Sequence, residues 1–340
     1  MQYSVKGVYH LYFGDATRHP IIGNYLRSLP EMPQKIVLEN VPSSRYARLW
    51  RVVREVYRLR SHRSWALQCH DVVSAVVGTF LWRGRVIYDS HEIYASLATG
   101  LVSRFVALLE RIAISRADIV VFPSDYRAEY YDVDRSKVRI VQNLFYPYGE
   151  HDSISSRNHG GERDEATNRS LRFVYTGLFT PARAIDNIVA AFAHERLANC
   201  RLILAGQQTE YLAEILSSAT DNVEYVGELR HDAVCELLET ADAGFALYRP
   251  INENNRRCAP TKIFEFLYFG VHVIANESPY VAQISDSVAE GCLTSISEIS
   301  EAKIVEACLR VQKRGTEVEA GVREVVCWNS QMSILESLYS

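Results

Sequence analysis

The sequence lacks the cysteine arrangements of secreted and zinc-binding proteins. Its seven cysteines are an odd number, are widely scattered and include no Cys-x-x-Cys pair. Neither a disulfide framework nor a zinc site is therefore predicted. Because scattered thiols without a disulfide framework are typical of a reducing compartment, we expect a cytoplasmic protein.

Long apolar runs are missing as well. No run approaches the roughly 20 apolar residues that span a bilayer. Residues 1–10 also lack the basic-then-apolar layout of a signal peptide. We therefore expect a soluble protein, or one bound peripherally to a membrane.

The chain has no excess of positive charge. It contains 37 Lys and Arg against 41 Asp and Glu, so its formal net charge is −4. This balance argues against a protein that coats nucleic acid. Any anion must instead be bound by local groups of positive charge.

The length and the order of segments predict two domains. The 340 residues exceed one ordinary core, and the hydrophobic content of 48% is enough for two. Between them, Gly149–Ser170 is polar, with Ile154 as its only large aliphatic residue, which is typical of a linker. The predicted parts are 1–148, a linker at 149–170, a second domain at 171–325 and a final helix at 326–340.

Strand-like and helix-like segments alternate in both halves, which predicts two α/β domains with parallel sheets. We expect the carboxyl ends of both sheets to face a cleft between the domains. The first strand, Gly7 to Phe13, is not followed by Gly-x-Gly-x-x-Gly, so a dinucleotide site in this half has little support.

Polar residues follow a predicted strand of the first domain. Asp89-Ser90-His91-Glu92 comes directly after Arg85 to Tyr88, at the carboxyl end where parallel sheets bind ligands. His91 is therefore a candidate catalytic residue, although a lone histidine is more often structural. In the first loop, Arg18 could contact a ligand or lie in a solvated turn.

A basic amphipathic helix is predicted over Ser43–Arg63. Its arginines surround an apolar stripe, and Glu55 is its only acidic residue. Arg48, Arg51 and Arg54 could contact an anionic membrane. The alternative is a domain-surface helix with its aromatic stripe in the core and its arginines solvated, and nucleic acid is a weaker third choice.

The stretch from Arg257 to Asn276 carries the strongest signal. Pro260 suits the first turn of a helix and Gly270 suits its exit, with a strand directly after it. Thr261, Lys262 and Glu265 place polar atoms at the first turn, where the backbone N–H groups and the helix dipole favour an anion. Such a helix start is typical of a site for the diphosphate of a nucleotide sugar.

Five segments of the second half together resemble the GT-B glycosyltransferases, in particular glycosyltransferase family 4 with a Pro-x-Lys helix start. They are Tyr175-Thr-Gly-Leu-Phe-Thr-Pro-Ala-Arg183, Leu202-Ile-Leu-Ala-Gly206, Val223-Glu-Tyr-Val-Gly227, Ala241-Asp-Ala-Gly-Phe-Ala-Leu247 and Pro260-Thr-Lys-Ile-Phe-Glu-Phe-Leu-Tyr-Phe-Gly-Val-His-Val-Ile274. In the first half Tyr88-Asp-Ser-His-Glu92 is similar, and Trp328 to Tyr339 resembles the family's last helix, which crosses back to the N-terminal domain.

This resemblance implies roles for donor-binding residues. Arg183 and Lys262 match the family's cation pair, which meets the charge of the departing diphosphate without a metal ion or another cofactor. Glu265 matches the glutamate that accepts hydrogen bonds from the ribose. The further donor-binding residues that it implies are Gly177, Gly206, Val226 and Thr261.

The resemblance also implies a reaction. His91 matches the histidine that faces the reacting sugar, and retention of anomeric configuration by front-face attack is expected, so no paired carboxylates are required. Asp89, Glu92 and Asp125 stay open as further candidates. The sequence departs from the family at Arg257, where a glutamate is usual, and in lacking the glycine-rich loop after the first strand.

We therefore expect a transferase that moves a sugar from a nucleotide-sugar donor, a UDP-sugar above all, to a glycan acceptor. A lipid-linked acceptor in cell-surface polysaccharide assembly fits the basic helix. The alternatives are a nucleotide-sugar epimerase of the same fold and a non-catalytic relative that binds a nucleotide sugar or a partner enzyme.

Overall fold

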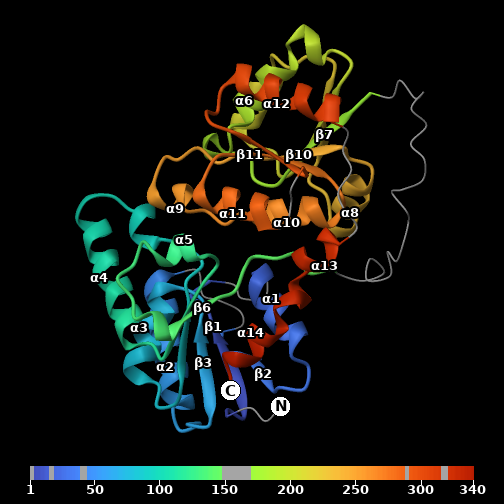
Figure 1. The fold of residues 1–340 in the computed structure, drawn as a ribbon. Helices are drawn as coiled ribbons and strands as arrows, with labels where there is room; N and C mark the ends of the chain where they lie inside the picture. Colours follow the sequence, from blue (N-terminus) through green and yellow to red (C-terminus); the bar gives the residue numbers. More distant parts are fainter. Residues whose placement is uncertain (1–3, 15–18, 39–43, 148–169, 288–290, 315–320) are drawn as a thin grey trace. The chain divides into compact units, whose positions relative to one another are not determined.

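The computed structural model describes the chain except for residues 1–3, 15–18, 39–43, 148–169, 288–290 and 315–320 (Figure 1). The predicted linker lies almost wholly outside these described residues. The chain forms two compact units. One comprises Met1–Asn143, Asn252–Asn254 and Gln331–Ser340, and the other comprises Leu144–Ile251 and Asn255–Ser330. We call them the first and the second domain.

The first domain is built on a six-stranded parallel sheet with the strand order β2-β1-β3-β4-β5-β6. Its strands are β1 (Gly7–Leu11), β2 (Gln34–Ile36), β3 (Trp65–Cys69), β4 (Val86–Asp89), β5 (Ile119–Phe122) and β6 (Val138–Ile140). The central strands β4 and β5 are buried along their whole length, as expected where helices cover both faces of a parallel sheet.

The helices of the first domain lie on both faces of this sheet. Figure 1 shows α2, α3 and α4 gathered on one side of the strands. The helices are α1 (Pro20–Ser28), α2 (Arg45–Leu59), α3 (Val72–Leu81), α4 (Gly100–Arg116), α5 (Asp125–Ala128) and α14 (Met332–Ser337), with 3-10 turns η2 (Tyr94–Leu97) and η3 (Arg135–Lys137). Asp71 caps α3 by accepting from the Ser74 backbone N–H at 2.9 Å.

The second domain contains a six-stranded parallel sheet with the order β12-β11-β10-β7-β8-β9. Counted from β7, this is the strand order of a nucleotide-binding Rossmann fold. The strands are β7 (Arg172–Thr176), β8 (Arg201–Ala205), β9 (Val223–Gly227), β10 (Ala243–Ala246), β11 (His272–Asn276) and β12 (Leu293–Ile296). The prediction of two Rossmann-like α/β domains is confirmed.

Helices α6 and α12 pack together on one face of the second sheet, and α10 packs on the other (Figure 1). The helices are α6 (Ile185–Phe192), α7 (Glu210–Leu216), α8 (His231–Glu239), α10 (Thr261–Tyr268), α11 (Pro279–Ser287), α12 (Glu301–Arg314) and α13 (Val322–Val326), with 3-10 turns η5 (Pro181–Arg183) and η6 (Glu195–Leu197). The loop expected between β10 and α10 contains a further short helix, α9 (Glu253–Arg256).

The end of the chain differs from the single helix expected over Trp328 to Tyr339. The structure has a 3-10 turn, η7 (Trp328–Gln331), followed by α14. The change occurs where the Gln331 side chain pairs with the backbone of Gln142, accepting at 2.9 Å and donating at 3.0 Å. Those two bonds tie α14 to the first domain.

A glycine lets α10 approach the second sheet closely. A Cβ on Gly244 of β10 would lie 2.7–2.8 Å from three ring atoms of the buried Phe266 of α10. Such distances lie inside van der Waals contact, so Phe266 can occupy this place only because the strand has no side chain there.

We predict that Gly244→Ala lowers the free energy of unfolding by about 1–3 kcal/mol, because the added methyl group overpacks the core against Phe266. Denaturant unfolding would measure the loss. The matched control is Gly321→Ala, since no atom lies within 4 Å of the Cβ it would add. Equal stability of the two variants would contradict this account of the packing.

Candidate functional site

Each of the three neighbouring strands β7, β8 and β9 of the second domain has a glycine at its carboxyl end. The φ angles of Gly177, Gly206 and Gly227 are +127°, +156° and +85°, all in the left-handed region that favours glycine. The Gly177 N–H donates to Ala205 O at 2.9 Å, and the Gly206 N–H donates to Gly227 O at 2.8 Å. These residues form a continuous edge of backbone, which we call the glycine edge.

Close packing keeps this edge free of side chains. A Cβ on Gly206 would lie 2.0 Å from the Gly177 carbonyl oxygen, so a side chain at Gly206 would push the two loops apart. Val226 precedes Gly227 and is partly exposed. The predicted residues Gly177, Gly206 and Val226 thus lie together at the carboxyl edge of the sheet.

The start of α10 brings positive charge to the glycine edge. Pro260 is the N-cap residue of this helix and supplies no side-chain cap, and Thr261 at its first position is exposed. The Lys262 side chain runs beside Gly177, since a Cβ there would lie 3.7 Å from Lys262 Cε. An ammonium group and first-turn N–H donors together favour an anion.

Glu265 is the acid of this site and keeps only 7% of its surface exposed. Its Oε2 accepts a hydrogen bond from Lys262 Nζ at 2.5 Å. A carboxylate this deeply buried needs a charged or hydrogen-bonding partner, and Lys262 supplies one. The pair therefore places one acceptor and one donor beside the glycine edge.

Arg183 reaches the same end of the sheet from the loop after β7. Its guanidinium carbon lies 3.9 Å from the centre of the Tyr248 ring, a cation–π contact that orients the side chain. Tyr248 follows β10, and β7 and β10 are the two strands between which the strand order reverses. Ligands of open α/β sheets bind at that point.

The loop that carries Arg183 is held by Arg249, a residue that the sequence did not single out. Arg249 donates to Pro181 O at 2.6 Å and to both carboxylate oxygens of Asp186, at 2.7 and 2.8 Å. Partial burial acts to raise the pKa of Asp186, but hydrogen bonds from Arg249 and Tyr211 lower it below its ordinary value. The same loop holds Ala184 in the left-handed conformation, at φ 55°.

The first domain has its own cluster of polar residues at the carboxyl ends of its strands. His10 lies in β1, His70 directly follows β3 and His91 follows β4. Since β1 lies between β2 and β3, the strand order of this sheet reverses between β1 and β3. The cluster therefore occupies the ligand-binding position of the first sheet, as expected for His91.

Hydrogen bonds connect these histidines. His10 Nδ1 lies 3.0 Å from His70 Nε2, and His70 Nδ1 lies 3.0 Å from His91 Nε2. Asp89 Oδ2 is 3.4 Å from His70 Nδ1 and 3.8 Å from His91 Nε2, and it accepts from Gln68 Nε2 at 3.1 Å. We call His10, His70, Asp89 and His91 the histidine cluster.

The surroundings favour the neutral forms of His10 and His91. Burial, with His70 and Arg127 nearby, lowers the pKa of His91 to about 4, although Asp89 opposes this shift. Burial lowers the pKa of His10 to about 3 as well. Burial alone would raise the pKa of Asp89, but His91, His70 and Tyr25 hold it well below its usual range. Asp89 is therefore charged at neutral pH.

Within the described part of the chain, His70, Asp89 and His91 are the one group of potential ligands compact enough to hold a metal ion, with ligand atoms within 4.8 Å of one another. The facing ring nitrogens of His70 and His91 are already within hydrogen-bond distance of each other. We therefore interpret the cluster as a hydrogen-bonded network.

The structure separates the other candidates of the first domain. Glu92 is half-buried. Asp125 is exposed and lies 3.8 Å from Arg135. Arg48 donates to Phe13 O at 3.3 Å, beside the loop after β1. Arg18 lies outside the described residues.

Helix α2 does not bury its aromatic stripe in the core. Val52 and Val56 are its buried residues, whereas Tyr46 and Trp50 are 83% and 74% exposed. The alternative of an aromatic core stripe is wrong, because the small aliphatic residues of α2 provide the packing face. Arg51 is half-buried, and Arg54 is exposed and pairs with Glu55 at 3.1 Å.

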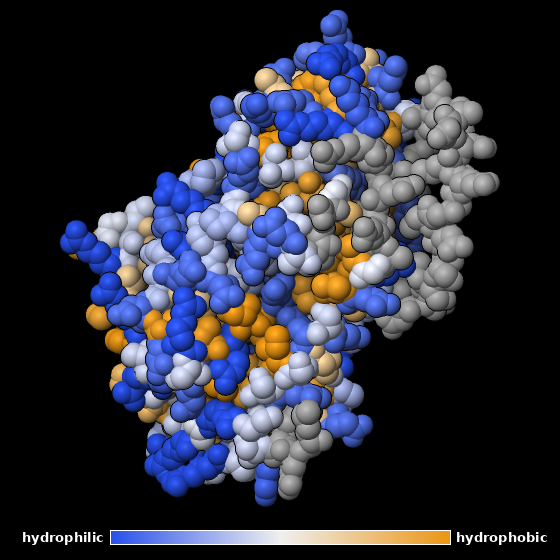
Figure 2. All heavy atoms as spheres, in the orientation of Figure 1, coloured by the Kyte–Doolittle hydropathy of each residue, from blue (hydrophilic) through white to orange (hydrophobic). Residues whose placement is uncertain are grey.

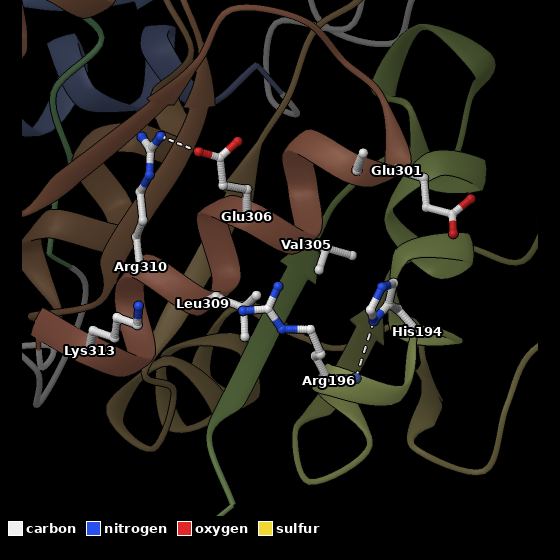
Figure 3. A pocket seen from close by; sticks show the side chains of 9 residues that line it. His194, Arg196, Glu301, Val305, Glu306, Leu309, Arg310 and Lys313 are labelled. Atoms are coloured by element: carbon white, nitrogen blue, oxygen red, sulfur yellow. Dashed lines mark hydrogen bonds and ion pairs between the residues drawn. The ribbon is translucent and has the colours of Figure 1, made fainter.

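A further hollow of the second domain lies between α12 and the segment after α6 (Figure 3). Its charged side chains come in both signs, and Arg310 already pairs with Glu306 at 2.6 Å. His194 accepts from the Arg196 backbone N–H at 3.1 Å. Because its positive and negative charges largely balance, this hollow is less suited to bind an anion than the glycine edge.

The sequence of the second domain matches a known family over most of its length. Residues 170–313 fit the family described as glycosyl transferases group 1. This match spans 144 of the 340 residues. Comparison of the sequence with the curated proteins gave no match.

Solved structures extend the likeness to the fold of the whole chain. Sucrose-phosphate synthase from Thermosynechococcus elongatus has a TM-score of 0.71, 13% identity and 98% coverage of both chains. HepE from Anabaena, in complex with UDP and glucose, has a TM-score of 0.67, 15% identity and coverage of 97% of this chain and 99% of that one. The catalytic domain of starch synthase IV from Arabidopsis thaliana, bound to ADP and acarbose, has a TM-score of 0.63, 12% identity and 99% coverage of both. The resemblance to GT-B glycosyltransferases is confirmed.

The neutral histidines make stability depend on pH. A histidine with a folded pKa of 3–4 stays neutral while the unfolded chain takes up protons near pH 6.5, so the free energy of unfolding falls as pH drops below 6.5. We expect each of His10 and His91 to contribute a loss of about 1–2 kcal/mol by pH 5.

Denaturant unfolding of the whole chain at pH 7.5 and 5.0 measures this loss. The variant His10→Asn, which has one titrating histidine fewer, should lose less stability between the two pH values than the unaltered protein. Identical losses in the two proteins would show that His10 titrates normally in the fold.

Proposed function

We propose that the protein is a retaining glycosyltransferase that moves a sugar from a nucleotide-sugar donor, a UDP-sugar above all, to a glycan acceptor. The observation that carries this proposal is the start of α10 beside the glycine edge, within a group 1 glycosyltransferase domain. Structures of this fold have been solved with UDP or a UDP-sugar, among them HepE from Anabaena in complex with UDP-glucose, which supports the choice of donor.

The donor diphosphate would bind at the glycine edge. Gly177 lets the backbone approach the phosphates, and Lys262 and Arg183 supply the charge that meets the departing diphosphate without a metal ion. Glu265 would accept hydrogen bonds from the ribose hydroxyls, for which two carboxylate oxygens are suited. Lys262 and Glu265, bonded to each other without a ligand, would then exchange this contact for phosphate and ribose.

The transfer itself would proceed by front-face attack. The leaving phosphate assists deprotonation of the attacking hydroxyl, so no pair of carboxylates is needed. By the resemblance to the GT-B glycosyltransferases, His91 would contact the reacting sugar.

We predict that Lys262→Ala weakens binding of a UDP-sugar about tenfold or more, because a hydrogen bond to a charged group contributes about 1.5–3 kcal/mol. Glu265→Gln should weaken it as well, through loss of charge at the ribose. Isothermal titration calorimetry of the whole chain measures both effects.

The chain offers a matched control for the lysine. Lys303 and Glu306 of α12 form a second Lys–Glu pair at the same spacing of three residues, at 3.0 Å. Lys303→Ala should leave donor affinity unchanged. If Lys262→Ala binds the donor as tightly as Lys303→Ala does, the assignment of the donor site is wrong.

We further propose that the acceptor is lipid-linked, as in cell-surface polysaccharide biosynthesis, and that the first domain docks on an anionic membrane surface. None of the helices in the described residues could cross a bilayer. However, α2 and α4, which both pack against α3, expose apolar side chains. They are Tyr46, Leu49, Trp50 and Tyr57 of α2 and Leu101, Val102, Phe105 and Leu108 of α4.

The chemistry of this surface suits a membrane interface. Figure 2 shows apolar side chains beside hydrophilic ones at the outer edge of the first domain, where α4 lies in Figure 1. Exposed Trp and Tyr rings lie well at the headgroup level, and arginines attract anionic lipids. A core function for these aromatic rings is ruled out by their exposure.

Charge reversal tests the membrane proposal. We expect Arg51→Glu combined with Arg54→Glu to reduce sedimentation with vesicles of phosphatidylcholine and phosphatidylglycerol at least tenfold, since each basic residue near the surface contributes about 1 kcal/mol. Arg230→Glu combined with Arg310→Glu changes the net charge equally, but on the second domain, and should have little effect. Equal binding by both double variants would contradict docking through α2.

A further inference from the structure

A chain of hydrogen bonds in the first domain begins at Gln34. Its side-chain amide nitrogen lies 3.1–3.3 Å from the backbone carbonyl oxygens of Tyr25, Leu26 and Leu29. Carbonyl oxygens only accept, so the amide nitrogen must face them, and a flipped amide would bring oxygen against oxygen. The Gln34 Oε1 atom is thereby fixed as an acceptor 3.0 Å from His10 Nε2.

This fixed acceptor determines the proton position on His10. Facing Gln34 Oε1, His10 Nε2 must carry the hydrogen. A neutral imidazole carries only one hydrogen, so His10 Nδ1 is bare and accepts. Complete burial of His10 favours this neutral form.

The constraint passes through His70 to His91. His70 Nε2 faces the bare His10 Nδ1 at 3.0 Å and must donate. In the neutral form of His70 its Nδ1, which lies 3.0 Å from His91 Nε2 and 3.4 Å from Asp89 Oδ2, is then an acceptor. His91 Nε2 faces that acceptor at 3.0 Å and must donate in turn. His91 Nδ1 is then the bare nitrogen at the end of the chain.

His91 is also the member of the chain that a ligand can reach. It keeps 13% of its side chain exposed, whereas His70 and His10 are fully buried. Asp89 Oδ2 lies 3.4 Å from His70 Nδ1 and 3.8 Å from His91 Nε2, so the hydrogen between these two nitrogens lies near its negative charge. Arg127 donates to the His91 backbone carbonyl and holds the residue in place.

We propose that Gln34, His10 and His70 are positioning residues that fix His91 in the tautomer with a bare Nδ1, so that His91 accepts a hydrogen bond from a saccharide hydroxyl. The saccharide part of this inference rests on the proposed function, whereas the tautomer does not. This hydrogen bond transfers no proton. The saccharide hydroxyl keeps its hydrogen, and the bond to His91 Nδ1 orients the hydroxyl group.

Nitrogen-15 NMR of the imidazole rings tests the tautomer directly. In the whole chain at pH 7.5, with the signals of His91 identified by their loss in His91→Gln, we expect a protonated Nε2 and a bare Nδ1. A protonated Nδ1 on His91 would overturn the proposal whatever the activity of the protein.

Two variants of His10 test the chain of hydrogen bonds from Gln34 through His10 and His70 to His91, which we call the relay. His10→Leu removes the acceptor that His70 requires, so we expect both tautomers of His91 to appear. In His10→Asn the amide oxygen can take the position of Nδ1, and the single tautomer should be kept. A single, unchanged His91 tautomer in His10→Leu would overturn the relay, and thermal denaturation shows whether each variant is folded.

Kinetics separate positioning from general damage. For transfer from a UDP-sugar, His10→Leu should lower kcat about tenfold, the effect of losing one oriented hydrogen bond in the transition state, with donor affinity unchanged and with kcat restored in His10→Asn. An unchanged kcat in His10→Leu would contradict the orienting role. If the tautomers behave as expected but no nucleotide sugar binds, the proposed function fails and the relay stands.

Discussion

The parallel direction of the strands is the constraint on which both candidate sites depend. Within each sheet every carboxyl end lies on one edge, so residues far apart in the chain meet there without any direct link. Gly177 and Gly206 meet in this way in the second domain, and His70 and His91 do so in the first. In each domain the residues of the candidate site therefore lie at the carboxyl edge of the sheet, beside the point where the strand order reverses.

The repeating pattern of the sequence was sufficient to predict the two sheets, whereas the donor-side residues were predicted from the resemblance to GT-B glycosyltransferases. Buried parallel strands are short apolar runs, and Pro260 and Gly270 mark the ends of α10 within two residues. Tyr248 and Arg249 were missed, although they are the second and third residues after the end of β10. Ligands of parallel sheets bind at the carboxyl ends of the strands. Applying this rule to every predicted strand would have identified both residues.

Other features depend on contacts that no local pattern contains. His10 lies inside β1, and its importance follows from Gln34 in β2 and from His70 directly after β3. For α2 the periodicity predicted a helix, but the face that packs was decided by α3 and not by the size of the apolar residues. The short side chains of Val52 and Val56 are buried and the large rings are exposed, the reverse of what the size of the side chains alone suggests.

The Tyr339 hydroxyl donates to the Gln68 side chain, which in turn bonds to Asp89, so the histidine cluster is completed by a residue that follows the whole second domain in the chain. During synthesis on a ribosome, domains generally fold in order from the N-terminus. Here the first domain would wait, with the buried Gln68 amide oxygen not yet bonded to Tyr339, until residues 331–340 have emerged. Its folding is therefore completed after translation of the second domain.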